Sequence, residues 1–213
     1  MTDGPANAFL RRLSDGAAIE AQIHEPITPA HLEGWQATWR SAIESTRVQL
    51  AARQASPSEY PESAHWDWNK KIAVLGGFAA YRTFALIAEG DLQGLMVVET
   101  VQHRARLNDE QGRRDLNLVY VEFLEAAPWN RPEHARPVRF RGTGSVLIAA
   151  AIQVSRDEGY RGRLGLHSLP QSEPFYRNTI GMQDFGPDDG YPGKLRYFEM
   201  TARVADDFLK RGA

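Results

Sequence analysis

The residues best suited to bind an anion are Arg139, Phe140, Arg141, Gly142, Thr143, Gly144 and Ser145, which follow one another in the chain. Glycines at 142 and 144 allow the backbone to approach a ligand closely and to adopt positive φ. An apolar periodic run predicts a helix over residues 144–158, and the first N–H groups of a helix point unpaired toward an anion. Arg139 and Arg141 add positive charge. These residues alone indicate either a structural turn or a cradle for a diphosphate.

Two other phosphate-binding loops fit this segment poorly. A nucleoside-triphosphate loop requires a lysine directly after its second glycine, but Ser145 follows Gly144. A dinucleotide-binding fingerprint requires three glycines after an early first strand, whereas this segment has two and lies late in the chain.

The strongest candidate for acid–base chemistry is Glu122, which interrupts an otherwise apolar stretch over residues 119–124. Burial in such a strand is expected to raise the pKa of a carboxyl group toward the operating pH, which suits a general base. The alternative is a carboxylate on a solvated face or in a structural ion pair. Glu125 is the competing base, and it points to the opposite face unless a bulge intervenes.

The elements that must position these residues follow from periodicity and from turn residues. Strands are predicted over residues 17–23, 81–88, 92–101, 116–126, 164–167 and 195–201, and helices over 28–53, 66–75, 144–158 and 170–178, with an amphipathic tail after the last strand. A strand, a glycine loop, a helix and another strand make a β-α-β unit, so the sheet must be mixed.

The loop resembles the signature Gln/Arg-x-x-Gly-x-Gly/Ala of the GCN5-related N-acetyltransferase superfamily, through Arg139, Gly142 and Gly144. Phe175-Tyr176 followed by Gly181-Met182 lies where that family has Phe-Tyr-x-x-x-Gly-Phe, although this chain has one more residue before the glycine. The resemblance covers residues 17–201. It implies an α/β (α+β) fold with a central mixed, mostly antiparallel twisted sheet flanked by helices, and a V-shaped splay between the two central strands.

The resemblance also implies how acyl-coenzyme A binds. The thioester would lie where the strand over 118–126 parts from the strand over 164–167, with the diphosphate on residues 141–145. The pantetheine would follow the backbone of Phe123, Leu124, Glu125 and Ala126. An amine would attack the thioester directly, with Glu122 or Glu125 taking a proton. Tyr176, which also belongs to the implied cofactor site, would protonate the departing thiolate.

The acceptor side is expected in the segment between the early helices, at Glu59, Tyr60, Trp66 and Trp68. Acidic and aromatic groups together suit a cationic amine. The alternative is that Trp66 is a core anchor and that Glu59 is a solvated loop charge.

Composition narrows the class of protein. A net charge of −2 and a pI near 6.3 provide no basic field for nucleic acid. The absence of cysteine excludes a thiol nucleophile, and the scattered histidines give no metal-site pattern. No apolar stretch approaches the roughly 20 residues of a membrane span. We therefore expect a cytoplasmic protein with a flexible N-terminus over residues 1–16 and one acyltransferase domain over 17–213. An edge strand and a long apolar helix are compatible with a homodimer.

The prediction is thus an N-acetyltransferase that uses acetyl-coenzyme A as co-substrate, without a metal, and acylates an amine of a small molecule, peptide or protein. One alternative is a catalytically inactive acyl-coenzyme A-binding or protein-interaction module of the same fold, and another is a thioester hydrolase. His167 and Ser168 are adjacent, but there is no Gly-x-Ser-x-Gly elbow and no recognisable third carboxylate, so their proximity is attributed to chance.

Overall fold

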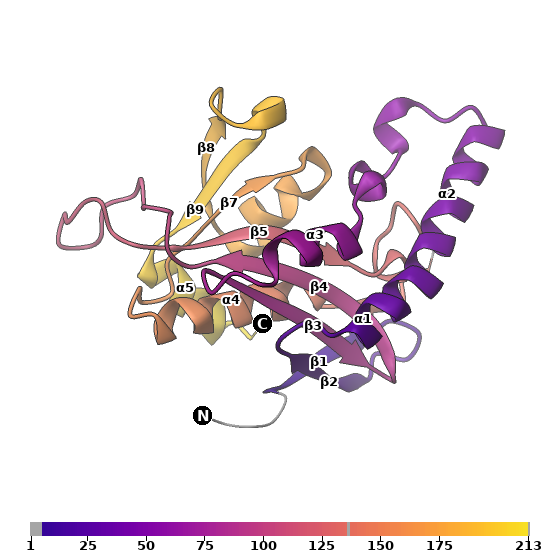
Figure 1. The fold of residues 1–213 in the computed structure, drawn as a ribbon, viewed down its shortest axis with the longest axis horizontal. Coiled ribbons are helices and arrows are strands. Elements are labelled where there is room, and N and C mark those ends of the chain that lie inside the picture. The colour runs from indigo at the N-terminus through magenta and orange to yellow at the C-terminus, as the bar shows by residue number, and fades with distance from the viewer. Residues whose placement is uncertain (1–5, 136, 213) are drawn as a thin grey trace. The chain divides into compact units, whose positions relative to one another are not determined.

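The computed structural model describes residues 6–135 and 137–212, which form nine strands in one sheet (Figure 1). The strands are β1 (Ala6–Arg12), β2 (Ala18–His24), β3 (Tyr81–Ala88), β4 (Asp91–Glu99), β5 (Val119–Ala126), β6 (Phe140–Arg141), β7 (Leu164–Ser168), β8 (Gln183–Pro187) and β9 (Arg196–Met200). Their order is β6-β1-β2-β3-β4-β5-β7-β9-β8. β5 and β7 are parallel, whereas β1 pairs antiparallel with β2 and β6, and β9 with β7 and β8. The predicted mixed sheet is confirmed.

The described α-helices are α1 (Pro29–Gly34), α2 (Arg40–Ala52), α3 (Trp68–Leu75), α4 (Thr143–Asp157) and α5 (Ala202–Lys210). The described residues also include two π-helical turns. Trp35–Trp39 connects α1 with α2, and Phe175–Ile180 lies between β7 and β8. Within the described ranges, no helix combines the length and the apolar character needed to cross a membrane.

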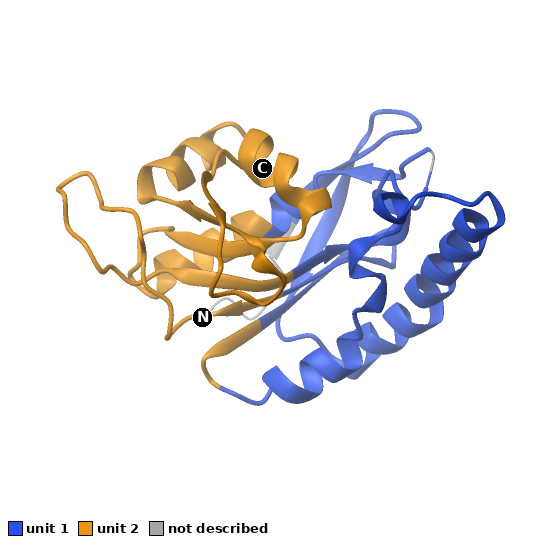
Figure 2. Ribbon diagram, turned by 90° about the horizontal axis from the view of Figure 1, so that it is seen from above, with its two compact units in different colours: residues 1–78, 83–96, 124–147 blue, residues 79–82, 97–123, 148–213 orange. Residues whose placement is uncertain are grey.

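The backbone divides into two compact units (Figure 2). Unit 1 comprises residues 1–78, 83–96 and 124–147, and unit 2 comprises residues 79–82, 97–123 and 148–213. The strands β3, β4 and β5 each contribute residues to both units. The predicted anion loop belongs to unit 1, whereas Glu122 and Tyr176 belong to unit 2.

In unit 1 a nearly continuous helical run covers residues 29–52, as the apolar stripe predicted. Pro29 occupies the first turn, where its missing N–H costs no hydrogen bond. Trp35 and Trp39 are buried, and the Trp39 indole donates to the Leu92 carbonyl at 3.1 Å. The indole bond therefore fixes the helical run against β4.

The N-terminal segment corrects a prediction. Residues 1–16 were expected to be flexible, but β1 pairs with β2 over residues 6–11 and with β6. Leu10 is buried and Phe9 is exposed, as in a strand with one buried face. This alternation of buried and exposed residues is too short to be recognised in the sequence. Gly16, with φ of 76°, and the Arg12 N–H bond to the Ala17 carbonyl close the turn into β2. Residues 1–5 lie outside the described ranges.

Three other elements were missed or only partly predicted. β6 has two residues, and β8 is a short strand containing glycine and proline, so neither carries a recognisable period. The amphipathic tail is the helix α5, which Thr201 caps by accepting a hydrogen bond from the Val204 N–H.

His134 provides a pH-dependent prediction for unit 1. Thr46 Oγ1 donates to the Ala42 carbonyl, so it accepts from His134 Nδ1 at 3.2 Å. His134 Nε2 is buried with no partner among the described atoms. A proton on Nε2 would therefore be a buried donor without an acceptor, and burial lowers the pKa of His134 to about 4.

Because the unfolded chain binds this proton near pH 6.5, stability should fall as the pH decreases from about 6.5 toward 4. Between pH 7 and pH 5, we expect the free energy of unfolding to fall by roughly 1–2 kcal/mol more in wild type than in His134→Gln, after allowance for partial exposure. Urea unfolding of both proteins at the two pH values measures this difference. An identical pH dependence in the variant would show that His134 is not the responsible group.

Candidate functional site

The loop that leads into α4 has the backbone geometry of an anion cradle. Gly142 adopts φ of 104°, a left-handed conformation that favours glycine. The first intrahelical bond of α4 runs from the Val146 N–H to the Gly142 carbonyl at 2.8 Å. The N–H groups of residues 143–145 therefore have no intrahelical acceptor, and such groups attract anions.

Positive charge lies directly beside this helix start. Arg141 is the last residue of β6, and its side chain is exposed. Thr143 is buried, whereas Gly144 and Ser145 are partly exposed. The residues predicted to hold a diphosphate thus form one continuous feature, which consists of a strand end, a left-handed glycine and the first turn of a helix.

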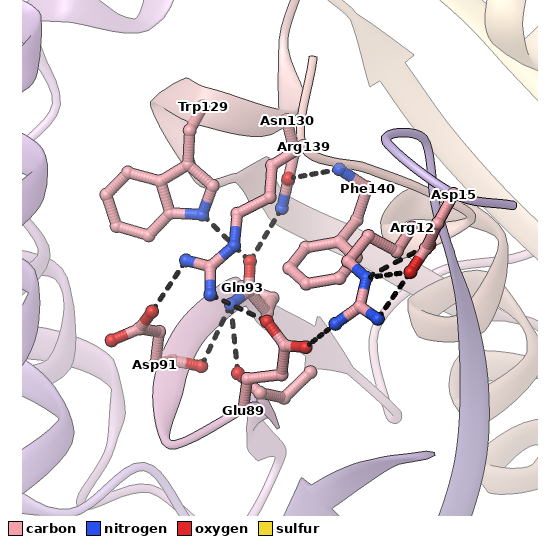
Figure 3. A network of polar contacts seen from close by, with 10 residues as sticks. Arg12, Asp15, Glu89, Asp91, Gln93, Trp129, Asn130, Arg139 and Phe140 are labelled. Carbon is pink, nitrogen blue, oxygen red and sulfur yellow. Dashed lines mark hydrogen bonds and ion pairs between the residues drawn. The ribbon is translucent and has the colours of Figure 1, made fainter. Parts of the chain in front are cut away.

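Arg139 makes contacts that the sequence did not predict. Its guanidinium donates to Asp91 at 2.6 Å and to Glu89 at 2.8 Å, in the turn between β3 and β4 (Figure 3). Glu89 also accepts from Arg12, and the Arg139 hydrogen bond is the largest cause that lowers the pKa of Glu89. The charge of Arg139 is therefore locally neutralised, and this side chain anchors the loop instead of adding charge to the cradle.

A buried amide network fixes the entry to the loop, and sequence reasoning missed it (Figure 3). Gln93 of β4 is fully buried, and its Oε1 accepts from Trp129 Nε1 at 2.9 Å and from Asn130 Nδ2 at 2.8 Å. Asn130 Oδ1 in turn accepts from the Phe140 N–H at 3.0 Å. The one signal in the sequence was a glutamine inside the apolar run of β4. Such satisfied networks specify a single local arrangement.

Gly94 permits the close approach of α4 to β4, and this gives a testable prediction. A Cβ atom on Gly94 would lie 2.8 Å from Leu147 Cδ1 and 2.9 Å from Thr143 Cγ2. Gly94→Ala must therefore displace the first turns of α4, at a cost of about 1–3 kcal/mol in stability. We expect a lower melting temperature together with weaker coenzyme A binding in calorimetry.

The matched control is Gly34→Ala in α1, where an added Cβ meets no atom within 4 Å. This change should stabilise the helix slightly and leave coenzyme A binding unchanged. Wild-type affinity in Gly94→Ala would show that the packing of α4 on β4 does not set the loop.

Glu125 is a buried anchor at the end of β5. The residue is 4% exposed, and its carboxylate accepts from Ser63 Oγ at 2.7 Å and from Trp68 Nε1 at 2.6 Å. Arg131 Nη1 lies 3.4 Å from the same carboxylate. Burial raises the pKa of Glu125, while the bonds from Ser63 and Trp68 act in the opposite direction. Both carboxylate oxygens thus accept hydrogen bonds that hold the segment from Ser63 to the start of α3.

The predicted acceptor residues have unequal exposure. Trp68 is fully buried and bonded to Glu125, so it offers no surface for direct contact with an acceptor and instead holds this segment in place. Glu59 is exposed, but Arg53 donates to it at 2.6 Å and lowers its pKa. Trp66 and Tyr60 are partly exposed, and Lys71 lies 4.5 Å from the centre of the Trp66 ring.

In unit 2, Glu122 is partly buried within β5. The phenol of Tyr81 has a raised pKa because of burial and, next, because of the charge of Glu122. Burial also raises the pKa of Tyr120, with Glu122 contributing. The electrostatic influence of Glu122 therefore reaches two neighbouring phenols.

The π-helical turn Phe175–Ile180 explains the extra residue noted in the sequence. The Gly181 N–H donates to the Tyr176 carbonyl at 3.0 Å, which is a bond across five residues. Gly181 then ends the turn with φ of 87°. Tyr176 is 6% exposed, and burial raises its pKa, so its phenol remains protonated.

β5 and β7 pair over a short distance. Their ladder joins Val119 with Leu164 and Tyr120 with Gly165. Within the described residues of these two strands, the pairing ends there. A parallel pair that separates after two rungs agrees with the splay predicted between the central strands.

Comparison with known proteins gave structural matches only. No protein-family model matches the chain, and no curated protein does. FeeM, an N-acyl amino acid synthase from uncultured soil microbes, matches with a TM-score of 0.51 and 12% identity, over 88% of this chain and 93% of FeeM. A protein from Desulfovibrio desulfuricans described as a GNAT-family acetyltransferase matches with a TM-score of 0.49 and 13% identity, over 85% and 99%. The GNAT domain of S. lividans PAT matches with a TM-score of 0.48 and 16% identity, over 94% and 98%.

At such identities the likeness is one of fold. The mixed sheet and the glycine loop that opens α4 were predicted from the sequence, and the short ladder between β5 and β7 agrees with the predicted splay. The chain therefore shares its fold with FeeM.

Proposed function

We propose that this protein transfers an acyl group, with acetyl as the default, from coenzyme A to a primary amine in a ternary complex. The observation that carries the proposal is the cradle formed by residues 141–145, in which a left-handed glycine precedes the N-terminus of α4. The diphosphate of coenzyme A is an anion of the size and charge that such N–H groups bind. The exposed Arg141 supplies charge for it.

The fold supports acyl transfer as the reaction to test first. FeeM, whose name describes N-acylation of an amino acid, shares this architecture. We infer that the pantetheine of acyl-coenzyme A pairs with the β5 backbone from Phe123 to Ala126, in continuation of the diphosphate site. This arrangement would bring the thioester toward the middle of β5, where Glu122 lies.

Glu122 is assigned the role of general base. A primary amine is an ammonium ion at neutral pH, and it must lose a proton before it can attack a thioester. Glu125 is a poorer candidate, because Ser63 and Trp68 occupy its two oxygens. Tyr176 is assigned the role of acid toward the thiolate, since its phenol stays protonated. We place the acceptor near Trp66, Tyr60 and Glu59, which suits a cationic amine.

Mass spectrometry after incubation with isotope-labelled acetyl-coenzyme A tests the proposal. The protein is mixed with an amine library and, separately, with a cell extract. We expect labelled amides together with an equal amount of free coenzyme A. Coenzyme A release without any labelled amine would indicate a thioester hydrolase. Binding of coenzyme A without release would indicate an inactive acyl-coenzyme A-binding module.

A further inference from the structure

Three side chains of unit 2 form a hydrogen-bonded line that the proposed mechanism does not use. The Tyr120 hydroxyl lies 2.7 Å from His167 Nδ1, and His167 Nε2 lies 3.1 Å from Asp188 Oδ2. Tyr120 belongs to β5, His167 to β7, and Asp188 to the turn after β8. Residues far apart in the sequence are thus brought into one chain of proton donors and acceptors.

The direction of each hydrogen bond follows from the ionisation of Asp188. Hydrogen bonds from Arg106 and then from His167 lower the pKa of Asp188 to about 2, so the carboxylate accepts. His167 Nε2 must therefore carry a proton. Burial lowers the pKa of His167, so the ring is neutral and Nδ1 has a lone pair. Tyr120 then donates to His167 Nδ1, and His167 Nε2 donates to Asp188, so both hydrogen bonds run in the same direction along the line.

Packing holds the two rings in line. His103 stacks on Tyr120 with ring centres 3.9 Å apart, and Tyr191 stacks on His167 at 3.7 Å. The Tyr197 ring lies 5.0 Å from His167 on a third side. The titratable or charged groups that face His167 are Tyr120 from β5, Tyr197 from β9, Asp188 and Tyr191 from the turn after β8, and Arg106 and His103 from the segment before β5.

One end of this line lies beside Glu122, and the other end reaches the surface. Tyr120 forms the last rung between β5 and β7, opposite Gly165. Glu122 follows two residues later in the same strand, so the two side chains share a face. At the far end, the Asp188 side chain is 19% exposed and pairs with the more exposed Arg106.

Amide formation from an ammonium ion releases one proton in each turnover. The nitrogen loses two protons as the C–N bond forms and the C–S bond breaks, and the thiolate takes one of them. The second proton must leave Glu122 before the next cycle. This requirement rests on the function proposed above.

We propose that Tyr120, His167 and Asp188 form a relay that carries this proton from Glu122 to solvent. A proton arriving at the Tyr120 oxygen allows the phenol to pass its own proton to His167 Nδ1. His167 releases its Nε2 proton to Asp188, which delivers it to water. Tyr120 and Asp188 return to their starting states, and His167 is left neutral with its proton on Nδ1. Proton exchange with water then restores the Nε2–H form of His167 before the next cycle, so no net charge remains. These residues are positioning residues for proton exit and do not contact the acyl group.

Tyr120→Phe tests the relay, because it removes the hydroxyl and keeps the ring that stacks on His103. The matched control is Tyr197→Phe, which removes a nearby hydroxyl that donates to Glu199 at 2.9 Å and lies outside the relay. With the amine found by the labelled-product screen, we expect kcat of Tyr120→Phe to fall about tenfold or more. The KM values should stay unchanged, and added imidazole buffer should restore part of the rate. The control should keep kcat and show no response to buffer.

A loss in Tyr120→Phe that no buffer restores, or an equal loss in the control, would overturn the relay. ¹⁵N NMR of the histidines provides a second test that needs no acceptor. In wild type, we expect His167 to be the Nε2–H tautomer. In Tyr120→Phe, its Nδ1 resonance should move toward the position of a ring nitrogen whose lone pair accepts no hydrogen bond. An Nδ1–H tautomer, or an unresponsive resonance, contradicts the relay alone. If the NMR result holds but the wild type acylates no amine, then the proposed function fails and the relay has no proton to carry.

Discussion

Replacing Glu122 by glutamine is expected to lower kcat by about 10²–10⁴-fold while coenzyme A still binds with wild-type affinity. Glutamine preserves the size of the side chain but cannot accept the proton that an ammonium ion must lose. Because the diphosphate site is assigned to residues 141–145, the change should leave the dissociation constant for coenzyme A unaltered. Steady-state kinetics with the identified amine, together with calorimetry, separate the two effects.

Glu44→Gln is the control for this experiment. Glu44 is an exposed carboxylate of α2 that pairs with Arg47, and its replacement should change neither turnover nor binding. Wild-type turnover in Glu122→Gln would remove Glu122 from the mechanism. A loss of turnover in Glu125→Gln alone would transfer the role of base to Glu125, provided that this variant remains folded.

The second large effect is expected at Glu125, where alanine should lower the free energy of unfolding by about 3–5 kcal/mol. The substitution leaves Arg131 and the Trp68 indole N–H in a buried site without their carboxylate. Buried donors without acceptors are costly, and the segment before α3 loses its attachment to β5. Urea unfolding monitored by tryptophan fluorescence gives this free energy directly.

Two further variants define the origin of that loss. Glu125→Gln should fall between wild type and alanine, since the amide retains one acceptor oxygen for Ser63 or Trp68. Glu44→Ala removes an exposed partner of an arginine and should cost less than about 1 kcal/mol. A loss in Glu125→Ala no larger than in Glu44→Ala would mean that the carboxylate does not organise this part of the chain.

The sequence predicted the elements whose periodicity extends over many residues. The helical run over residues 29–52, the helix α4 and the strands β3 and β4 each bury a regular apolar pattern. Proline or glycine near the ends of these elements indicated where they begin or end. β1, β6 and β8 escaped because they are short or carry glycine and proline. Their existence depends on neighbouring strands, which local sequence does not encode.

In the candidate site too, features built from consecutive residues were predicted, whereas contacts between distant residues were not. The cradle at residues 141–145 was predicted because its glycines and helix start are consecutive in the chain. The contacts of Arg139 and Trp68 could not be predicted from the sequence, since their partners Asp91, Glu89 and Glu125 lie many residues away. The line through Tyr120 and His167 was missed for the same reason, because only the pairing of β5 with β7 brings them together.

The central claim is that residues 141–145 bind the diphosphate of coenzyme A, and titration calorimetry with coenzyme A tests it most directly. We predict saturable one-to-one binding that weakens as salt is added, because charge contributes to it. Arg141→Glu should reduce the affinity strongly, whereas Arg203→Glu, an exposed arginine of α5, should not. Absence of binding heat at several temperatures, or equal affinity in Arg141→Glu and wild type, would contradict the account.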